Sequence, residues 1–133
     1  MGRLEGDVDP HCSVPAVGFM VMKGLLLHKP EIEELMAEFP KTTVILDHLA
    51  FCPGGDLEDP SWDYLMSLAK HDNVYVKISA FFRVTKEPWP YQGLRGKIRS
   101  LVDAFGADRL MWGSDWPWLT EVRPARGLHG TPL

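Results

Sequence analysis

One pattern recurs four times along the chain and constrains its fold more than any other feature: a short apolar run, a loop, then an amphipathic segment. The apolar runs are Val17–Met22, Thr42–Leu46, Asn73–Ile78 and Arg109–Trp112. Several are rich in the β-branched and aromatic residues that favour strands. Strands that alternate with helices predict a parallel sheet built through right-handed crossovers, so the expected class is α/β.

The expected helices have recognisable ends. They cover about residues 30–39, 60–69 and 91–105, with Pro30 and Asp59–Pro60 at the starts of the first two and Gly106 at the end of the third. Their inward faces, at helical spacing, are Ile32, Leu35, Met36 and Phe39; Trp62, Leu65, Met66 and Ala69; and Leu94, Ile98, Leu101, Val102 and Phe105.

The spacing of the strands indicates part of a barrel. Strand centres near Met20, Ile45, Val76 and Met111 place successive units 25, 31 and 35 residues apart. A (β/α)8 TIM barrel of about 250 residues uses about 31 residues per unit, so four βα units predict half a barrel. We expect this partial barrel over residues 16–119.

Composition and the chain ends narrow the function classes. Residues 1–15 and 120–133 are rich in Pro, Gly and charge without periodicity, and we expect disordered tails there. A formal net charge of −4 argues against nucleic-acid binding. No apolar run suits a membrane span or a signal peptide. Cys12 and Cys52 are expected to be reduced thiols. These features predict a soluble, cytoplasmic protein.

Ionisable and hydroxyl groups gather where each expected strand ends. They are Lys23 after the first strand, Asp47 and His48 after the second, Lys77, Ser79 and Arg83 in and after the third, and Ser114 and Asp115 after the fourth. Because the carboxyl ends of parallel strands meet at one edge of the sheet, we expect these groups to face one site. Chance would scatter such groups over both edges.

Asp115 is the best single candidate for catalysis. It follows Gly113, which allows a tight turn, and precedes Trp116–Pro117, which we expect to bury part of the carboxylate and shape a pocket. A carboxylate in that setting can serve as a general base. The alternative is an aspartate that caps the next helix. The other three strand ends favour the functional interpretation.

The remaining strand-end residues each have a functional and a structural interpretation. His48 can ligate a metal, orient water or donate a hydrogen bond, or it can be structural. Asp47 alternates to the other face and is expected to bond a loop backbone. Lys77 and Arg83 can bind a substrate carboxylate or an oxyanion, or form surface salt bridges. The tryptophans at 112, 116 and 118 can stack on a ring substrate or belong to the core.

Metal ligands are few. None of the five histidines forms an HxH or HxxxH motif. His48 and Asp115 supply at most two ligands, below the three protein ligands usual for catalytic zinc.

Three segments together resemble the amidohydrolase-related family: Val44–Ala50 (VILDHLA), Val74–Ser79 (VYVKIS) and Leu110–Pro117 (LMWGSDWP). Within it they are most similar to the branch of metal-dependent, barrel-fold hydrolases that contains lactonases. The resemblance spans about residues 17–118. It rests on the DH and GSDWP motifs in that order and separation.

The resemblance implies a distorted (β/α)8 barrel to which this chain supplies strands five to eight. His48 then matches the histidine that ends strand six, and Asp115 the aspartate of strand eight that activates the hydrolytic water. Arg83 lies in a region that often contacts substrate. With Lys77, Ser79 and Trp116 it completes the expected substrate-binding set.

The same resemblance leaves the metal unassigned. The HxH motif of strand one is absent, and Met20, Met22 and Lys23 stand in strand five where metal-binding members place histidine. The lactonase branch includes members that work without metal. We therefore expect no required cofactor, with a divalent metal such as zinc possible in full-length family members.

The predicted function is hydrolysis of a small lactone-like or other cyclic ester or amide by Asp-activated water. Half a barrel has unpaired strands, and its inner face, expected to carry Val44, Leu46 and Met111, lacks an opposing half. The expected partners are therefore a second copy or a complementing barrel half. The alternative function is a non-catalytic truncated product or interaction module. A nucleotide-binding domain is disfavoured because no GxGxxG or Walker loop occurs.

Overall fold

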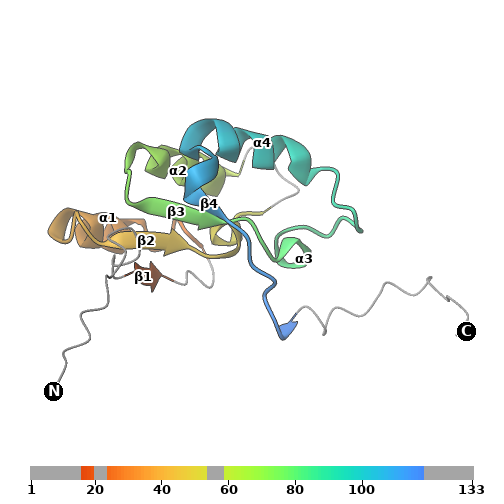
Figure 1. Cartoon of the computed structure of the whole chain (residues 1–133), viewed down its shortest axis with the longest axis horizontal. Coiled ribbons are helices and arrows are strands. Elements are labelled where there is room, and N and C mark those ends of the chain that lie inside the picture. Colours follow the sequence, from red (N-terminus) through yellow and green to blue (C-terminus); the bar gives the residue numbers. More distant parts are fainter. Residues whose placement is uncertain (1–15, 20–23, 54–58, 119–133) are drawn as a thin grey trace, which may run out of the picture.

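The computed structural model describes residues 16–19, 24–53 and 59–118. The strands among them form one parallel sheet (Figure 1). Its strands are β1 (Ala16–Phe19), β2 (Thr43–Leu46), β3 (Val74–Lys77) and β4 (Leu110–Met111). They lie in the order β1-β2-β3-β4, and each neighbouring pair is parallel. The predicted α/β class with a parallel sheet is confirmed. The expected tails and positions 20–23 lie outside the described residues.

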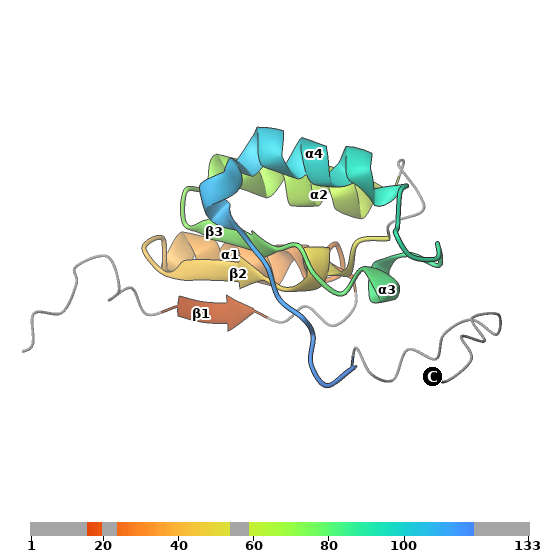
Figure 2. The ribbon, with the colours of Figure 1, turned by 45° about the vertical axis from the view of Figure 1, so that its right-hand side comes forward.

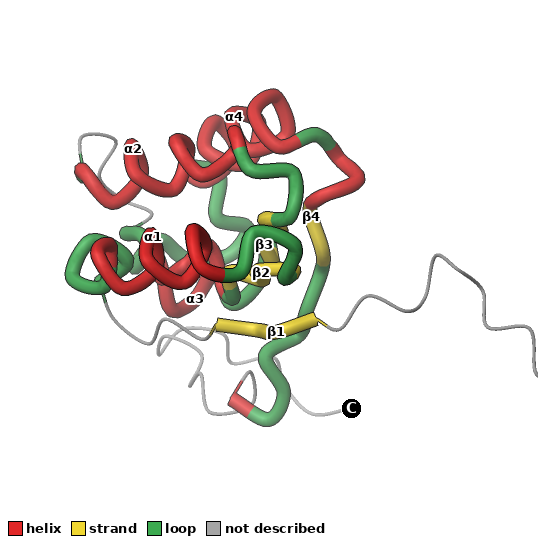
Figure 3. Tube along the Cα trace, turned by 90° about the vertical axis from the view of Figure 1, so that its left-hand side faces the viewer, coloured by secondary structure: helices red, strands yellow, loops and turns green. Residues whose placement is uncertain are grey.

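Helices fill the connections between the strands. They are α1 (Lys29–Glu38), α2 (Pro60–Ser67), α3 (Phe81–Val84) and α4 (Leu94–Phe105), with 3-10 turns at His48–Phe51, Leu68–Lys70 and Ala107–Arg109. Figure 2 shows α2 and α4 side by side over the sheet. Figure 3 shows the helices gathered on one side of the strands. Within the part of the chain that the structure describes, no helix has the length and apolar character needed to cross a membrane.

The helix ends follow the expected capping chemistry. The Asp59 carboxylate accepts a hydrogen bond from the Ser61 backbone N–H at 2.8 Å, and Pro60 is the first residue of α2. Hydrogen bonds from the Ser61 side chain and backbone also lower the pKa of Asp59. Gly106 ends α4 with a φ of 77°, a conformation that favours glycine.

The core lies between the sheet and the helices. Alternation along β2 and β3 buries Val44, Leu46, Val74 and Val76 among helix side chains that include Leu65 and Leu101. The expectation that Val44 and Leu46 line the inner face was wrong, because the register turns them toward the helices. The opposite face of the sheet instead carries Ile45, Tyr75 and Lys77, which are half-buried.

Two residues of the predicted apolar helix faces are exposed. Helix α1 ends at Glu38, so Phe39 leaves the helical direction and is about half-exposed. The buried stripe of α4 runs through Leu94, Lys97, Leu101 and Phe105, which leaves Val102 at its exposed margin. The place of Lys97 in that stripe was not predicted.

Candidate active site at the strand ends

Four of the predicted site residues meet at the carboxyl edge of the sheet. The Nε2 atom of His48, which follows β2, lies 3.1 Å from Oδ1 of Asp115, which follows β4. The Nδ1 atom of His48 lies 2.9 Å from the hydroxyl oxygen of Ser79, which follows β3. Arg83 in α3 donates from Nε to Oδ2 of Asp115 at 2.5 Å. Three strand ends and one helix thus supply a continuous polar chain.

The backbone at these strand ends is held in the left-handed region. His48, Ala80 and Asp115 have φ values of 50°, 53° and 58°. Such conformations cost non-glycine residues of order 1–3 kcal/mol each, so the surrounding contacts must hold them in place. The sharp turn that was expected at Gly113 is therefore made at Asp115 itself, because Gly113 does not have a left-handed φ.

The centre of the site is shielded from solvent. His48 is buried, Ser79 is 0% exposed, and only 9% of the Asp115 side chain is exposed. The His48 ring also packs edge-on against Phe51, with 5.3 Å between centroids. A carboxylate and an imidazole that lie 3.1 Å apart at such a depth are the arrangement expected of a proton-handling pair.

Arg83 forms the solvent side of the site. Its side chain is 30% exposed, and its guanidinium carbon lies 5.4 Å from the centroid of the Trp118 ring and 5.7 Å from that of Phe82. A guanidinium on an aromatic face can still offer N–H groups to an incoming anion. The contact with Trp118 was not singled out from the sequence.

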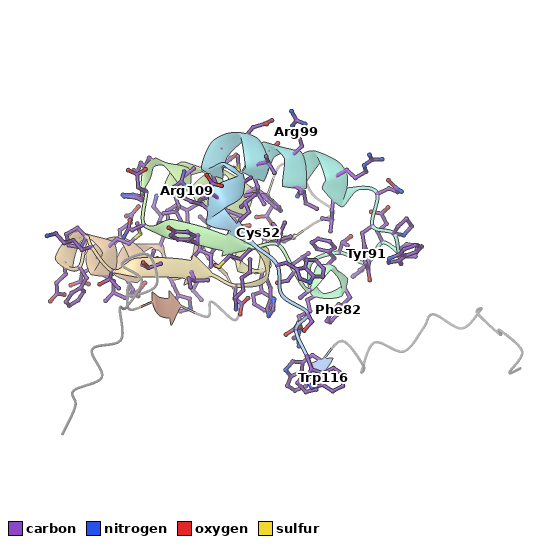
Figure 4. The ribbon with its side chains drawn as sticks, in the orientation of Figure 1. Cys52, Phe82, Tyr91, Arg99, Arg109 and Trp116 are labelled. Carbon is purple, nitrogen blue, oxygen red and sulfur yellow. The ribbon has the colours of Figure 1, made fainter. Side chains whose placement is uncertain are left out.

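Trp116 is a largely exposed residue beside the site. It is 72% exposed, so it does not belong to the core. Figure 4 shows Trp116 at the far end of the segment that follows β4, well away from the labelled Cys52 in the core. His48 and Arg83 are the side chains that occupy the carboxylate.

Lys77 and Asp47 form an ion pair beside His48. Lys77 Nζ lies 3.3 Å from Oδ2 of Asp47, which is the salt-bridge alternative for that lysine. Asp47 accepts a hydrogen bond from the His48 backbone N–H at 3.1 Å, as the loop-backbone prediction required. Its Oδ1 also lies 3.4 Å from His48 Nδ1, a proximity that strand alternation alone did not suggest.

The described residues do not complete a metal centre. Among them, no group of three or more His, Cys, Asp and Glu side chains is placed to hold an ion. His48 and Asp115 are two potential donors, but the facing atoms of this pair are engaged with each other and Arg83 takes the second carboxylate oxygen. Catalytic zinc usually takes three protein ligands, so these residues do not fit a resident zinc ion by themselves.

Comparison with known proteins decides the family. The family model described as amidohydrolase matches residues 1–132. The chain belongs to the amidohydrolase family.

Relatives of this chain include proteins named as lactone hydrolases. L-fucono-1,5-lactonase of Burkholderia ambifaria is 35% identical over 94 residues, covering 68% of this chain and 31% of that protein. 4-Sulfomuconolactone hydrolase of Hydrogenophaga intermedia is 30% identical over 74 residues, covering 55% of this chain and 24% of that protein. In both comparisons the match spans less than a third of the relative's length.

A solved amidohydrolase supports the same fold. The crystal structure of an amidohydrolase from Burkholderia multivorans with bound zinc matches with a TM-score of 0.59 at 23% identity. The match covers 74% of this chain and 37% of that one.

Proposed function

We propose that the chain supplies strands five to eight of a (β/α)8 barrel and, with them, part of the active site of a lactone-type hydrolase. The observation that carries the proposal is the His48–Asp115 contact of 3.1 Å at the carboxyl edge of the sheet, where barrel enzymes place their chemistry. Two relatives that hydrolyse lactones support the substrate class. Among the described residues, the helices lie on one side of the sheet and β1 and β4 are its outer strands, which supports the partial barrel.

Asp115 is proposed as the general base. An ionised carboxylate has about four lone-pair sites on its two oxygens, and His48 and Arg83 each occupy one. A water molecule can therefore still donate to Asp115. The carboxylate takes a proton from this water as the water oxygen attacks the carbonyl carbon of the ring ester. The ring C–O bond then breaks, and the proton held by Asp115 passes to the leaving oxygen.

His48 and Arg83 have supporting roles in this proposal. The N–H of His48 would hold the carboxylate in place and, in the assembled site, help to polarise or position the substrate carbonyl. Arg83 is partly exposed and can offer its terminal N–H groups to an anionic substituent, such as a carboxylate or sulfonate on the ring. Lys77 and Trp116 remain proposed substrate contacts at the rim.

Assembly of a complete site tests the proposal. The chain is assayed on neutral and anionic lactones, alone and mixed with a polypeptide that carries the first four βα units of the Burkholderia ambifaria relative. We expect hydrolysis from the mixture, and a loss of about 10²–10⁴-fold in kcat for Asp115→Asn with KM little changed. Asp103→Asn, on the exposed face of α4, is the matched control. An Asp115→Asn mixture with near wild-type kcat would refute the role of this residue.

The sheet edges favour one alternative, a non-catalytic module that associates through β1 or β4. Outer strands offer backbone donors and acceptors to another chain. A stoichiometric complex with the complementing units that hydrolyses none of the lactones would favour this alternative over the hydrolase.

A further inference from the structure

We infer that Ser79 is a positioning residue that selects the protonation pattern of His48, keeping the proton on Nε2, where it is donated to Asp115. The inference rests on the proposed function only for its catalytic consequence, since the proton pattern itself follows from the contacts. It replaces the sequence-based expectation that Ser79 binds substrate.

Ser79 is too deeply buried to be a substrate contact. It is 0% exposed, and its hydroxyl oxygen lies 2.9 Å from Nδ1 of His48. The segment after β4 covers the hydroxyl from another side, because a Cβ atom placed on Gly113 would lie 3.6 Å from it. The Ser79 hydroxyl is therefore directed at the imidazole and enclosed by backbone.

The partners of the imidazole determine where its proton sits. An ionised Asp115 can only accept, so Nε2 must carry the hydrogen across the 3.1 Å contact. A neutral imidazole then has a bare Nδ1, which requires a donor. The Ser79 hydroxyl is that donor at 2.9 Å, so the chain of bonds runs from Ser79 through His48 to Asp115.

Asp47 favours the opposite arrangement. Its Oδ1 lies 3.4 Å from the same Nδ1, and an ionised carboxylate there stabilises a proton on Nδ1. Lys77 and the His48 backbone N–H engage Asp47 and hold it beside the ring. The two neighbours of Nδ1 therefore act against each other, and the shorter contact belongs to Ser79.

Without the Ser79 hydroxyl, the Asp47 carboxylate should determine which ring nitrogen of His48 carries the proton. In Ser79→Ala the Asp47 carboxylate, which can only accept, still lies beside Nδ1, so the ring proton moves to Nδ1. A neutral ring protonated on Nδ1 would turn the Nε2 lone pair toward Asp115. The carboxylate would then lose the donor that orients it for its proposed role as base.

Nitrogen NMR of the full 133-residue chain with ¹⁵N-labelled histidine reads this pattern directly, at a pH of about 8, where free imidazole is neutral. The His48 signal is identified by its absence in His48→Gln. We expect a proton on Nε2 alone in the wild type and in Ser79→Thr, which keeps the hydroxyl. We expect a proton on Nδ1 in Ser79→Ala. Asp47→Asn combined with Ser79→Ala should restore the Nε2–H form, because an amide can donate to Nδ1.

Two results would overturn the inference: a wild-type His48 without a proton confined to Nε2, or an unchanged pattern in a Ser79→Ala variant whose amide spectrum is folded. If Ser79→Ala fails to fold, the wild-type and Ser79→Thr spectra still decide. In the assembled hydrolase, Ser79→Ala should lower kcat without changing KM, and Ser79→Thr should restore it. Absent hydrolysis with the expected NMR pattern counts against the proposed function and leaves the role of Ser79 intact.

Discussion

Arg83 donates a hydrogen bond to the carboxylate of Asp115 across 2.5 Å, so the residue proposed to bind the substrate anion also contacts the proposed base. An incoming carboxylate or sulfonate would share the guanidinium with Asp115. Binding of the anion and orientation of the base are therefore coupled through one side chain.

The first prediction concerns substrate charge. Arg83→Gln removes the cation, and a lost charged hydrogen bond of roughly 1.5–3 kcal/mol corresponds to a loss of about 10–100-fold in kcat/KM for an anionic lactone. A neutral lactone of the same ring should lose much less. Steady-state kinetics on both substrates in the assembled enzyme measure the difference. Arg99→Gln, on the exposed face of α4, is the control. Equal losses on the two lactones would contradict anion recognition by Arg83.

The second prediction concerns the buried thiol. Burial raises the pKa of Cys52 to about 11, and its Sγ donates to the Ser61 carbonyl oxygen at 3.5 Å. At pH 8 a Cys12→Ser variant should react slowly with a thiol reagent when native and rapidly in denaturant, because the thiolate is the nucleophile. Fast labelling of a folded sample would contradict this burial.

The raised pKa of Cys52 also predicts how the free energy of unfolding changes with pH. Because the pKa in the folded state lies above the ordinary value of 9.0, folding favours the neutral thiol. This contribution is fully present below about pH 9 and is lost as the pH rises through about 11. Urea midpoints should fall over that range, and they should fall less in Cys52→Ala.

The sequence predicted the sheet well because its strands are short apolar runs separated by amphipathic helices, a pattern set by burial. The meeting of His48 and Asp115 was also predictable, since both follow strands of one parallel sheet. The depth of Ser79 and the exposure of Trp116 were not, because periodicity places a residue on a face without telling how much of that face is covered.

Lys97 shows a second limit of sequence patterns. A lysine in a helix stripe ordinarily indicates a solvated face, yet its ammonium reaches the Pro53 carbonyl at 2.8 Å. That partner is distant in sequence and carries no side-chain signal. Trp62 donates to the same carbonyl oxygen at 2.7 Å, so two helices hold one loop carbonyl.

The third prediction follows from this contact. Lys97→Met keeps most of the apolar stem but loses the charged hydrogen bond and the ammonium that sits 4.4 Å from the Trp62 ring centroid. We expect a loss of roughly 1–3 kcal/mol in the free energy of unfolding, measured by urea titration. Lys86→Met, at an exposed position, is the control. An unchanged midpoint for Lys97→Met would show that this lysine contributes no net stability.

The fourth prediction concerns association through the sheet face on which the described part of the chain places no helix. Ile45, Tyr75 and Lys77 lie on that face, and β1 and β4 are the outer strands of the described sheet. Contact with a second copy or a complementing half would remove the apolar side chains of this face from water. It would also pair the free backbone hydrogen-bonding groups of the outer strands. We therefore expect the isolated chain to elute above 15.0 kDa, with a mass that grows with concentration in light scattering.

A single charged substitution should show whether the chain associates through this sheet face or through another exposed apolar surface. Ile45→Lys places an ammonium on the open face, where it is solvated in a monomer but buried without a partner in the associated form. We expect the variant to shift toward 15.0 kDa, whereas Phe39→Lys, at the exposed end of α1, should associate like the wild type. A wild-type chain that stays a 15.0 kDa monomer at all concentrations and unfolds cooperatively would contradict the partial barrel, because such a domain has closed its core without further strands.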